Sequence, residues 1–462
     1  MKYALFGLAL VGALPLAALG VLSRKCLAAL MGLVFVVVLA FDSTAVNFIS
    51  YEFYRGTARG LEVSLAYILA AAVLLAGEIA GFLRPVRRTS LFGSPGTWLF
   101  LAYFAWCAVS ACVNDNALPL REAMLGGVWT PHFLLRGRML SLFELWKMAM
   151  LFLVYAATYS YLSRVRDAKA IFRALAFVVL AVFLMVVRDH LVGIYQVRGP
   201  FPHPNSLAMF MTLVGCVFFA AYLNLPKSFY RTLCVCAFVA ASGIVFRTYS
   251  RGAILCYPLS VGFSALVSLC ARFSPRKVLR LAPLALVGLL GLALMMPRIV
   301  ERFEKAPESS GEKRRFFART ALNVVRDHPV AGVGLNNWAI FLNGHEEYQD
   351  PSPAGRDEKG DIGIVETIYL LTAAECGWVG LVLLLAWFLY FWWIALRLAF
   401  RLARTRWAYI PVGLLGGLTG CYLQSCLEWV LKQQLNFLLL MVCFATLAWL
   451  NQNERELRMA EA

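Results

Sequence analysis

Apolar residues fill long runs along almost the whole chain. A helix that spans a membrane needs about 20 mainly apolar residues, and thirteen runs come close to that length. They lie near residues 3–22, 27–41, 61–82, 97–113, 144–163, 170–188, 205–223, 229–246, 252–271, 278–296, 366–396, 407–427 and 432–450. This pattern predicts an all-α integral membrane protein with about 12–13 transmembrane helices. The second run is short, and a re-entrant segment is the alternative there. The first run looks like a signal peptide, but the apolar run directly behind it favours a retained helix.

The polar segments between these runs alternate in charge. Segments that follow odd-numbered runs are basic, as in SRK at 23–25, RPVRR at 84–88 and RLARTR at 401–406. Segments that follow even-numbered runs mix both signs, as in Asp42, Glu52, Arg55 and Arg59, in Asp115, Arg121 and Glu122, and in Arg188, Asp189 and Arg198. Cytoplasmic loops of membrane proteins collect Arg and Lys. The odd-numbered segments are therefore predicted to be cytoplasmic, and the even-numbered ones and the N-terminus to lie outside.

The longest polar stretch divides the chain into four parts. Residues 1–296 hold the first ten runs, 297–365 form one large extracytoplasmic loop, 366–450 hold the last three runs, and 451–462 are a cytoplasmic tail. Within the loop, SSGEKRRFFARTALNVVRDHP predicts a helix that is capped by Ser309 or Ser310 and stopped by Pro329.

Composition agrees with the membrane assignment. Hydrophobic residues make up 61% of the chain, charged residues 15%, and the mean hydropathy is +0.71, which excludes a soluble, disordered or secreted disulfide-rich protein. The excess of 43 Lys and Arg over 26 Asp and Glu is explained by topology and does not indicate nucleic acid. The 12 cysteines lie in or beside apolar runs, so we expect neither a disulfide framework nor a metal site.

All five histidines fall in segments that follow even-numbered runs. They are His132, His190, His203, His328 and His345. The long loop and the segments that hold Arg198 and Arg251 belong to the same set. If these residues do chemistry, they do it together on the extracytoplasmic side. The alternative is that polar residues of any kind simply gather in loops.

Two of the motifs lead into predicted helices from that side. In RGPFPHPNSLAMFM, residues 198–211, Arg198 and His203 stand at a membrane boundary, and Asn205 can cap the helix that follows. In FRTYSRGAILCYPLS, residues 246–260, Arg247 and Arg251 occupy an outer loop where topology does not favour arginine. The fork of donors on arginine suits phosphate or carboxylate. The alternative is that both arginines reach for lipid headgroups.

Two further motifs lie in and behind the long loop. VVRDHPVAGVGLNNW spans residues 324–338 and is followed by His345. VETIYLLTAAECGWVGL, residues 365–381, places Glu366 at the mouth of the eleventh run and Glu375 deeper in it. A carboxylate inside an apolar helix usually faces a cavity or a partner.

Taken in order, these motifs resemble the O-antigen ligase and polymerase superfamily. The resemblance covers residues 195–385 and rests on Arg-Gly before Pro-Asn, Ser-Arg-Gly, Asp-His-Pro with Gly-Val-Gly-Leu-Asn-Asn, and Tyr-Leu with Glu-x-Gly-x-x-Gly. Members are bacterial inner-membrane glycosyltransferases with a glycosyltransferase-C-like fold and one large periplasmic loop. The resemblance implies a multi-pass protein of lipopolysaccharide or exopolysaccharide biosynthesis whose active site faces the periplasm.

The resemblance also implies the reaction and its residues. A glycan would pass from undecaprenyl diphosphate to a lipid, glycan or protein acceptor, without metal, nucleotide sugar or other cofactor. Arg198 and Arg251 would bind the diphosphate, with Arg247, Arg319 and Arg326 as helpers. Other positions implied to contact substrate are His203, Asn205, His328 and Asn336.

The chain departs from the family pattern at one position. The family commonly has a histidine just before the Tyr-Leu segment, where this chain has Glu366-Thr367. Glu366 is one candidate for the base that takes the acceptor proton. His345 or His328 from the long loop is the other, with inverting displacement at the anomeric carbon in both cases, and a different acceptor or a lost activity is a third reading.

Other functions fit the same composition. A polymerase of the same superfamily differs from a ligase only in its acceptor. A secondary transporter or flippase for an anionic solute would require an internal repeat and broken helices that meet at mid-membrane, and the chain shows no convincing repeat. A purely structural membrane protein would not need Arg, His and Glu gathered on one side.

Overall fold

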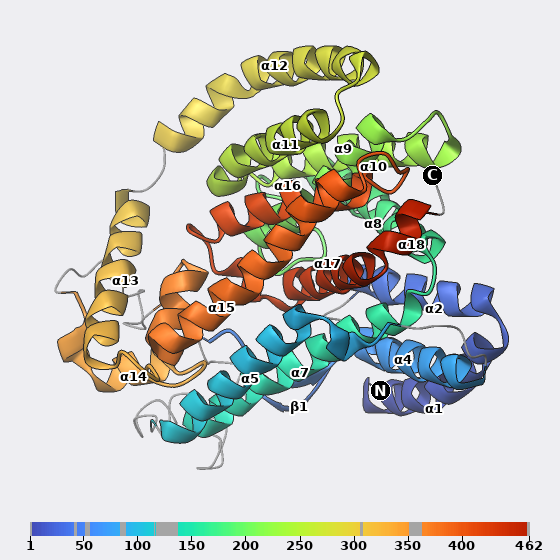
Figure 1. The fold of residues 1–462 in the computed structure, drawn as a ribbon. Helices are drawn as coiled ribbons and strands as arrows, with labels where there is room; N and C mark the ends of the chain where they lie inside the picture. The colour runs from blue at the N-terminus through green and yellow to red at the C-terminus, as the bar shows by residue number, and fades with distance from the viewer. Residues whose placement is uncertain are drawn as a thin grey trace.

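The computed structural model describes residues 2–40, 44–50, 56–83, 89–114, 116, 137–304, 308–350 and 363–459. Each of the thirteen apolar runs overlaps a helix (Figure 1). These helices are α1 (Lys2–Leu22), α2 (Arg24–Val36), α4 (Leu65–Leu83), α5 (Pro95–Val113), α7 (Gly137–Tyr161), α8 (Val165–Leu191), α9 (Pro204–Asn224), α10 (Phe229–Arg247), α11 (Arg251–Ala271), α12 (Pro275–Glu304), α15 (Ile368–Arg401), α16 (Tyr409–Gln424) and α17 (Gln434–Gln452). The long polar stretch holds α13 (Glu308–Asp327) and α14 (Trp338–Gly344), and α18 (Glu454–Met459) follows α17.

Within the described ranges, nine helices are long and apolar enough to cross a membrane: α4, α5, α7, α8, α9, α10, α11, α15 and α17. The predicted class, an all-α integral membrane protein, is confirmed. The second run is the short helix α2, which has 13 residues, and α16 has 16. α12 runs to Glu304, past its predicted end at residue 296, and α13 begins at Glu308, so Ser309 and Ser310 lie inside its first turn.

A small β-hairpin was not predicted. β1 (Val46–Ser50) pairs antiparallel with β2 (Gly60–Val63), so the run expected to be helical from residue 61 begins as a strand. Helix α4 starts only at Leu65, after Ser64, whose hydroxyl accepts the Ala66 amide (3.3 Å). Phe48 of β1 packs edge-on against Phe6 of α1, with ring centroids 5.2 Å apart.

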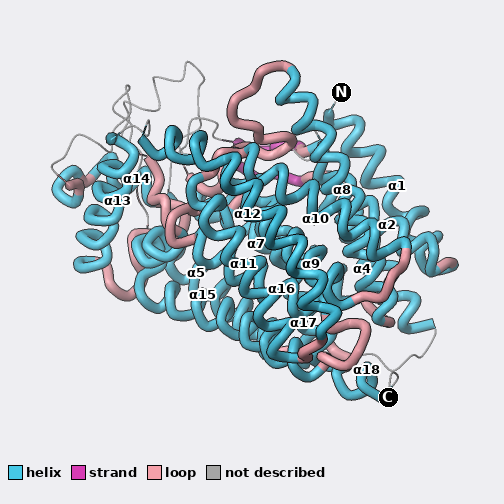
Figure 2. Tube along the Cα trace, turned by 90° about the horizontal axis from the view of Figure 1, so that it is seen from above, coloured by secondary structure: helices cyan, strands magenta, loops and turns pink. Residues whose placement is uncertain are grey.

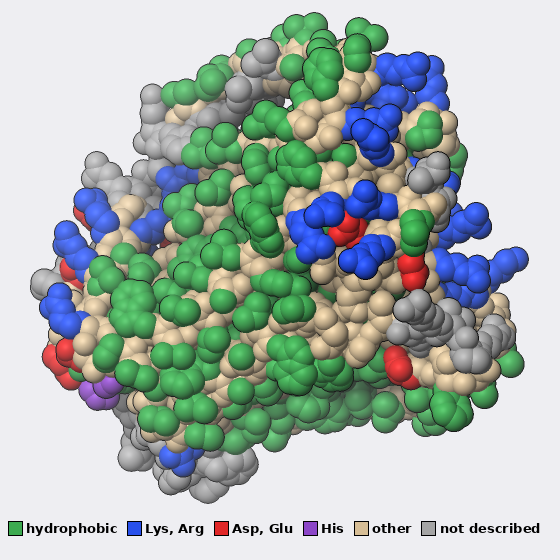
Figure 3. Space-filling model, viewed as in Figure 1, with side chains coloured by type: hydrophobic (Ala, Val, Ile, Leu, Met, Phe, Trp, Pro, Cys, Tyr) green, Lys and Arg blue, Asp and Glu red, His purple; other side chains and the backbone are tan. Residues whose placement is uncertain are grey.

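The bundle has two chemically different ends. The N- and C-termini lie at opposite ends (Figure 2). A broad apolar surface separates an end with both signs of charge, over α13 and α14, from a basic end near α18 (Figure 3). At the basic end, Arg397, Arg401 and Arg458 surround Glu454 at 2.9, 3.9 and 3.6 Å. Several charges used in the topology prediction lie outside the described residues: Asp42, Glu52, Arg55, Asp115, Arg121, Glu122 and the segment 84–88. Residues 351–362 of the long polar stretch and His132 also lie outside them.

Helix α16 packs backbone against backbone between α9 and α11, and glycines make this possible. A methyl group added at Gly413 would lie 2.3 Å from the Cα of Val217 on α9. On another side of the same helix, methyl groups at Gly416 and Gly420 would lie 1.8 and 2.0 Å from serine hydroxyls of α11. Small residues that let helix backbones approach are a main source of packing energy in membranes. α16 therefore fixes α9 and α11 relative to each other.

We predict that Gly413→Ala lowers the free energy of unfolding by about 1–3 kcal/mol, because the added methyl group overpacks the contact with α9. The measurement is thermal unfolding of the purified protein in detergent. Gly262→Ala on α11 is the control, since nothing lies within 4 Å of its added methyl group. Equal stability of the two variants would contradict the role assigned to α16.

Candidate active site

A cavity of about 1050 Å³ lies in the bundle. Five inter-helix segments contribute to its wall: those between α2 and α4, α8 and α9, α10 and α11, α12 and α15, and α16 and α17. Every one of these segments follows an even-numbered apolar run. The segments grouped by sequence therefore meet around one space.

Three helices point their N-termini at this cavity. Pro204 and Asn205 of α9, Arg251 of α11 and Gln434 of α17 all line it. The helix dipole makes the start of a helix favourable for anions. At α9 the dipole acts without a free N–H, because the first residue is Pro204 and the Asn205 amide donates to His203 Nδ1. Three such starts around one cavity give it an affinity for negative charge.

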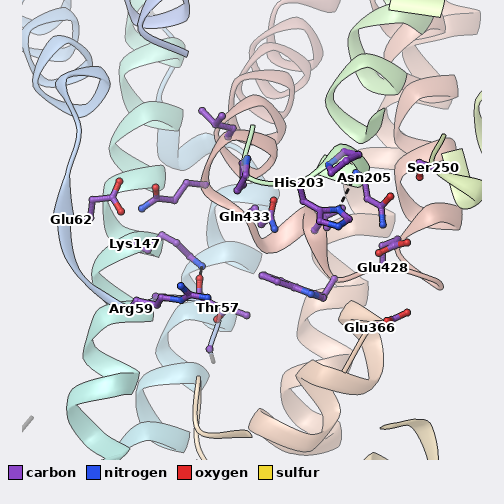
Figure 4. A pocket seen from close by; sticks show the side chains of 18 of the residues that line it. Thr57, Arg59, Glu62, Lys147, His203, Asn205, Ser250, Glu366, Glu428 and Gln433 are labelled. Atoms are coloured by element: carbon purple, nitrogen blue, oxygen red, sulfur yellow. Dashed lines mark hydrogen bonds between the residues drawn. The ribbon is translucent and has the colours of Figure 1, made fainter. Parts of the chain in front are cut away.

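Arg251 and Arg314 add full positive charges to the lining. Arg314, on α13, lies between two carboxylates: its Nε forms an ion pair with Glu366, and its Nη2 lies 3.4 Å from Glu428 Oε1. Glu366 stands just before α15, and Glu428 lies between α16 and α17. Figure 4 shows the two carboxylates on the same side of the cavity. One arginine thus forms ion pairs with two carboxylates.

Glu428 has an unusual environment for a carboxylate. Burial raises its pKa to about 7, and the nearby Glu366 acts in the same direction. A hydrogen bond from Asn205 and the charges of Arg314 and Arg251 oppose this rise only in part. Near neutral pH, Glu428 is therefore a mixture of the neutral acid and the carboxylate.

His203, and not Asn205, caps α9. Its Nδ1 accepts the backbone N–H of Asn205 (3.1 Å), and Pro204 is the first helical residue. The prediction that Asn205 is the cap was wrong, because the helix begins at Pro204, two residues before the start that a cap at Asn205 requires. The Asn205 side chain is thereby free to face Glu428. Partial desolvation lowers the pKa of His203, against an opposing effect of Glu366, and this favours the neutral ring. Because Nδ1 accepts the Asn205 amide, the neutral ring carries its proton on Nε2.

Four of the predicted arginines do not contribute to the cavity lining: Arg198, Arg247, Arg319 and Arg326. Arg198 is exposed, and its Nη1 donates to Pro202 O (3.4 Å) beside His203. Arg247 contacts His190 and the hydroxyl of Tyr249. Arg319 is exposed and pairs with Asp350 at 3.3 Å, and Arg326 is also exposed.

His328 and His345 belong to an aromatic cluster outside the cavity. His345 stacks on Phe341 with centroids 4.3 Å apart, and its Nδ1 lies 2.9 Å from Phe341 O. His328 meets the same ring edge-on at 5.4 Å. Both histidines pack the region around α13 and α14.

Asn336 is a buried connector. With φ of +57°, its side chain accepts the Thr57 amide (2.8 Å) and donates to Ala58 O and Leu140 O, both at 2.8 Å. These bonds attach the segment before β2 to α7. Residues just before it attach the loop to α15: Val333 N donates to Ala374 O and Gly334 N to Glu375 O, both at 2.9 Å.

The loop docks on a break in α15. Gly377 has φ of +68°, and a methyl group there would lie 2.0 Å from Val330 O. At the same break, Glu375 forms a buried ion pair with Lys432 (3.3 Å). A second buried pair joins Glu144 and Lys147 at 2.6 Å. The motifs at 324–338 and 365–381 therefore bind each other, and Glu375 has the partner expected for a carboxylate inside an apolar helix.

Sequence reasoning missed Arg314, Glu428, Lys147 and the segment 56–62, which all contribute to the cavity. The signal for Glu428 was present, since it is the acid of an outer segment between the last two apolar runs. Four of the predicted site residues do line the cavity: His203, Asn205, Arg251 and Glu366.

Residues 236–385 match a protein family described as O-antigen ligase. This stretch therefore resembles an O-antigen ligase domain. It contains Arg251, Arg314 and Glu366, and the match confirms the resemblance to the O-antigen ligase and polymerase superfamily. Such a domain points to an enzyme of the membrane glycosyltransferase type that acts on a lipid-linked glycan and an acceptor. No curated protein matches the chain significantly.

We predict that Lys432→Met lowers the free energy of unfolding of the protein by about 3–5 kcal/mol, because it leaves Glu375 charged and unpaired in the interior. Adding Glu375→Gln should restore most of the loss, since the double variant removes both charges. The measurement is the thermal midpoint and the membrane level of both variants. A single variant as stable as the wild type would show that the pair is not important for the fold.

Proposed function

We propose that this chain transfers a glycan from undecaprenyl diphosphate to an acceptor hydroxyl on the extracytoplasmic side of the bacterial inner membrane. The observation that supports this most is the meeting of three helix N-termini with Arg251 and Arg314 around one cavity. Together they form a site for a compact, multiply charged anion. The O-antigen ligase domain supports a lipid-linked glycan as the source of that anion.

The diphosphate binds at the starts of α9, α11 and α17. Arg251 offers a fork of donors at the first position of α11. Arg198, at the exposed rim beside His203, attracts the donor as it arrives. The neutral His203 ring donates from Nε2 to a diphosphate or sugar oxygen. No metal is needed in this scheme, because fixed dipoles and guanidinium groups stabilise the leaving diphosphate.

Glu366 is the base. The acceptor oxygen forms a bond to the anomeric carbon, the bond from that carbon to the diphosphate oxygen breaks, and the diphosphate keeps the electron pair. The acceptor proton goes to the Glu366 carboxylate. In the free protein Arg314 pairs with both Glu366 and Glu428. An arriving diphosphate competes for Arg314, which frees Glu366 to accept the proton.

Ligase and polymerase reactions share these steps, since they differ in the acceptor and not in the bonds broken. His328 and His345 receive no role in this scheme, because their aromatic cluster does not line the cavity.

In cells that lack the gene, we expect Arg251→Lys and Glu366→Gln to fail to complement. Lysine cannot form the two-pronged contact, and Gln cannot accept the proton. The measurement is the ratio of lipid-linked glycan to finished surface polysaccharide, at matched membrane levels, and we expect the lipid-linked form to accumulate. Arg319→Lys is the control, as an exposed arginine of the same region that lies outside the cavity. Full complementation by both site variants would refute the proposal.

The affinity for undecaprenyl diphosphate should fall as the pH rises. Glu428, with a pKa of about 7, is largely neutral below that pH and negative above it, so the cavity loses positive character. Between about pH 6 and pH 8 we expect a loss of roughly threefold to tenfold for the wild type. Glu428→Gln removes the titrating group and should flatten the profile. Undecaprenyl diphosphate itself titrates in the same way with the wild type and with the variant. If the affinity of Glu428→Gln depended on pH as steeply as that of the wild type, Glu428 would not be responsible.

A further inference from the structure

The cavity has a second wall with different chemistry. Figure 4 shows Thr57, Arg59, Glu62 and Lys147 facing the group that contains His203, Asn205 and Glu428, with Gln433 between the two groups. This second wall consists of the segment 56–62, which leads into β2, together with Trp146 and Lys147 of α7. We call it the hairpin wall.

The charges of the hairpin wall balance. Lys147 Nζ lies 2.6 Å from Glu144 Oε2 and donates to Thr57 O (3.1 Å). The remaining charges, Arg59 and Glu62, are opposite in sign. Three helix starts and two arginines favour an anion across the cavity, whereas this wall offers hydrogen-bond donors and acceptors without net charge. It suits a neutral ligand rich in hydroxyl groups better than a second phosphate.

An indole ring lies within this wall. Trp146 Nε1 donates to Glu62 O (3.0 Å), which holds the ring against β2, and the side chain is partly exposed to the cavity. A fixed aromatic face with polar groups around it binds a flat apolar surface whose edge is polar. The C–H face and the hydroxyl rim of a sugar ring have this character.

The hairpin wall is also held in one conformation. The Thr57 amide donates to Asn336 Oδ1 (2.8 Å), and the Thr57 hydroxyl donates to Glu144 Oε2 (2.7 Å). Asn336 and Glu144 are buried, so the segment is held by side chains that are shielded from solvent. A preorganised surface loses little entropy when it binds a ligand.

We propose that the hairpin wall binds the acceptor, and that the acceptor is an uncharged glycan. This inference rests on the function proposed above. In an inverting displacement the acceptor oxygen attacks the anomeric carbon from the side opposite the departing diphosphate. With the diphosphate at the helix starts, that side is the hairpin wall. The new glycosidic bond forms there, the bond to the diphosphate breaks on the other side, and the acceptor proton passes through water in the cavity to the Glu366 carboxylate.

The test measures two kinds of ligand separately on the purified full chain in nanodiscs. One probe is undecaprenyl diphosphate without sugar. The others are two glycans from the same cells, freed of lipid and phosphate: the repeat-unit glycan and the core oligosaccharide. Saturation-transfer NMR follows the glycans, since it detects weak binding, and calorimetry follows the lipid.

We expect Trp146→Ala to weaken glycan binding about tenfold and to leave undecaprenyl diphosphate binding unchanged. Arg251→Ala should do the reverse. Trp98→Ala is the matched control, because Trp98 is a tryptophan whose Nε1 also donates to a backbone oxygen (Phe92 O, 2.9 Å), but it does not line the cavity. Binding of either glycan supports the inference, and which of the two binds separates a polymerase from a ligase.

Two results would overturn the inference alone: wild-type protein that binds neither glycan, or Trp146→Ala that keeps full glycan affinity. Binding of a Ser/Thr-rich peptide in place of both glycans would overturn it as well. If Trp146→Ala weakens both ligands equally, the side chain supports the cavity as a whole, and the hairpin wall is not a separate subsite. Failure of the proposed function looks different, since undecaprenyl diphosphate would then bind Arg251→Ala as well as it binds the wild type.

Discussion

The close contact of α16 with both α9 and α11 is the constraint on which the rest of the structure depends. α9 and α11 carry two of the three N-termini that surround the cavity, and α16 leads directly into the segment that holds Glu428. Glycines let the backbones approach so closely that a methyl group added at Gly413 would overlap the backbone of α9. A site built from helix dipoles works only if the helix axes keep their angles, because the field of each N-terminus falls off within a turn. Packing inside the bundle thereby determines the electrostatics at its end.

A second framework supports the opposite wall. The buried pairs Glu144–Lys147 and Glu375–Lys432 keep four charges neutral overall inside the bundle. Asn336 extends this framework to the segment before β2. The loop with Asn336 is itself anchored at the break in α15. A polar network inside a membrane protein is stable only when every member has a partner. Here Glu144 and Lys147 are partners on one helix, and the other contacts join segments far apart in the chain.

The sequence predicted the helices better than the site. Long apolar runs are an unambiguous signal, and all thirteen overlap helices. The hairpin was missed because its strands are short and one of them continues into an apolar run. Five of the segments that follow even-numbered runs meet at one cavity, because charge alternation reports which end of the bundle a segment occupies. Charge alternation does not report how deep a side chain lies or where it points. His328 and His345 could therefore not be distinguished from His203, although of these three only His203 lines the cavity. Arg314 and Glu428 become recognisable only when α13 and the segment before α17 are brought together.

The arginine shared by Glu366 and Glu428 has a consequence for turnover. Before any ligand arrives, the positive charge of Arg314 is already satisfied by carboxylates of the protein. An incoming anion therefore exchanges one set of contacts for another and gains only the difference. In the reaction proposed above, the spent carrier has the same charged headgroup as the donor and must leave the same site. In the proposed scheme Glu366 holds the acceptor proton after the transfer, and once it loses that proton the two carboxylates again compete with the headgroup for Arg314 and favour its release.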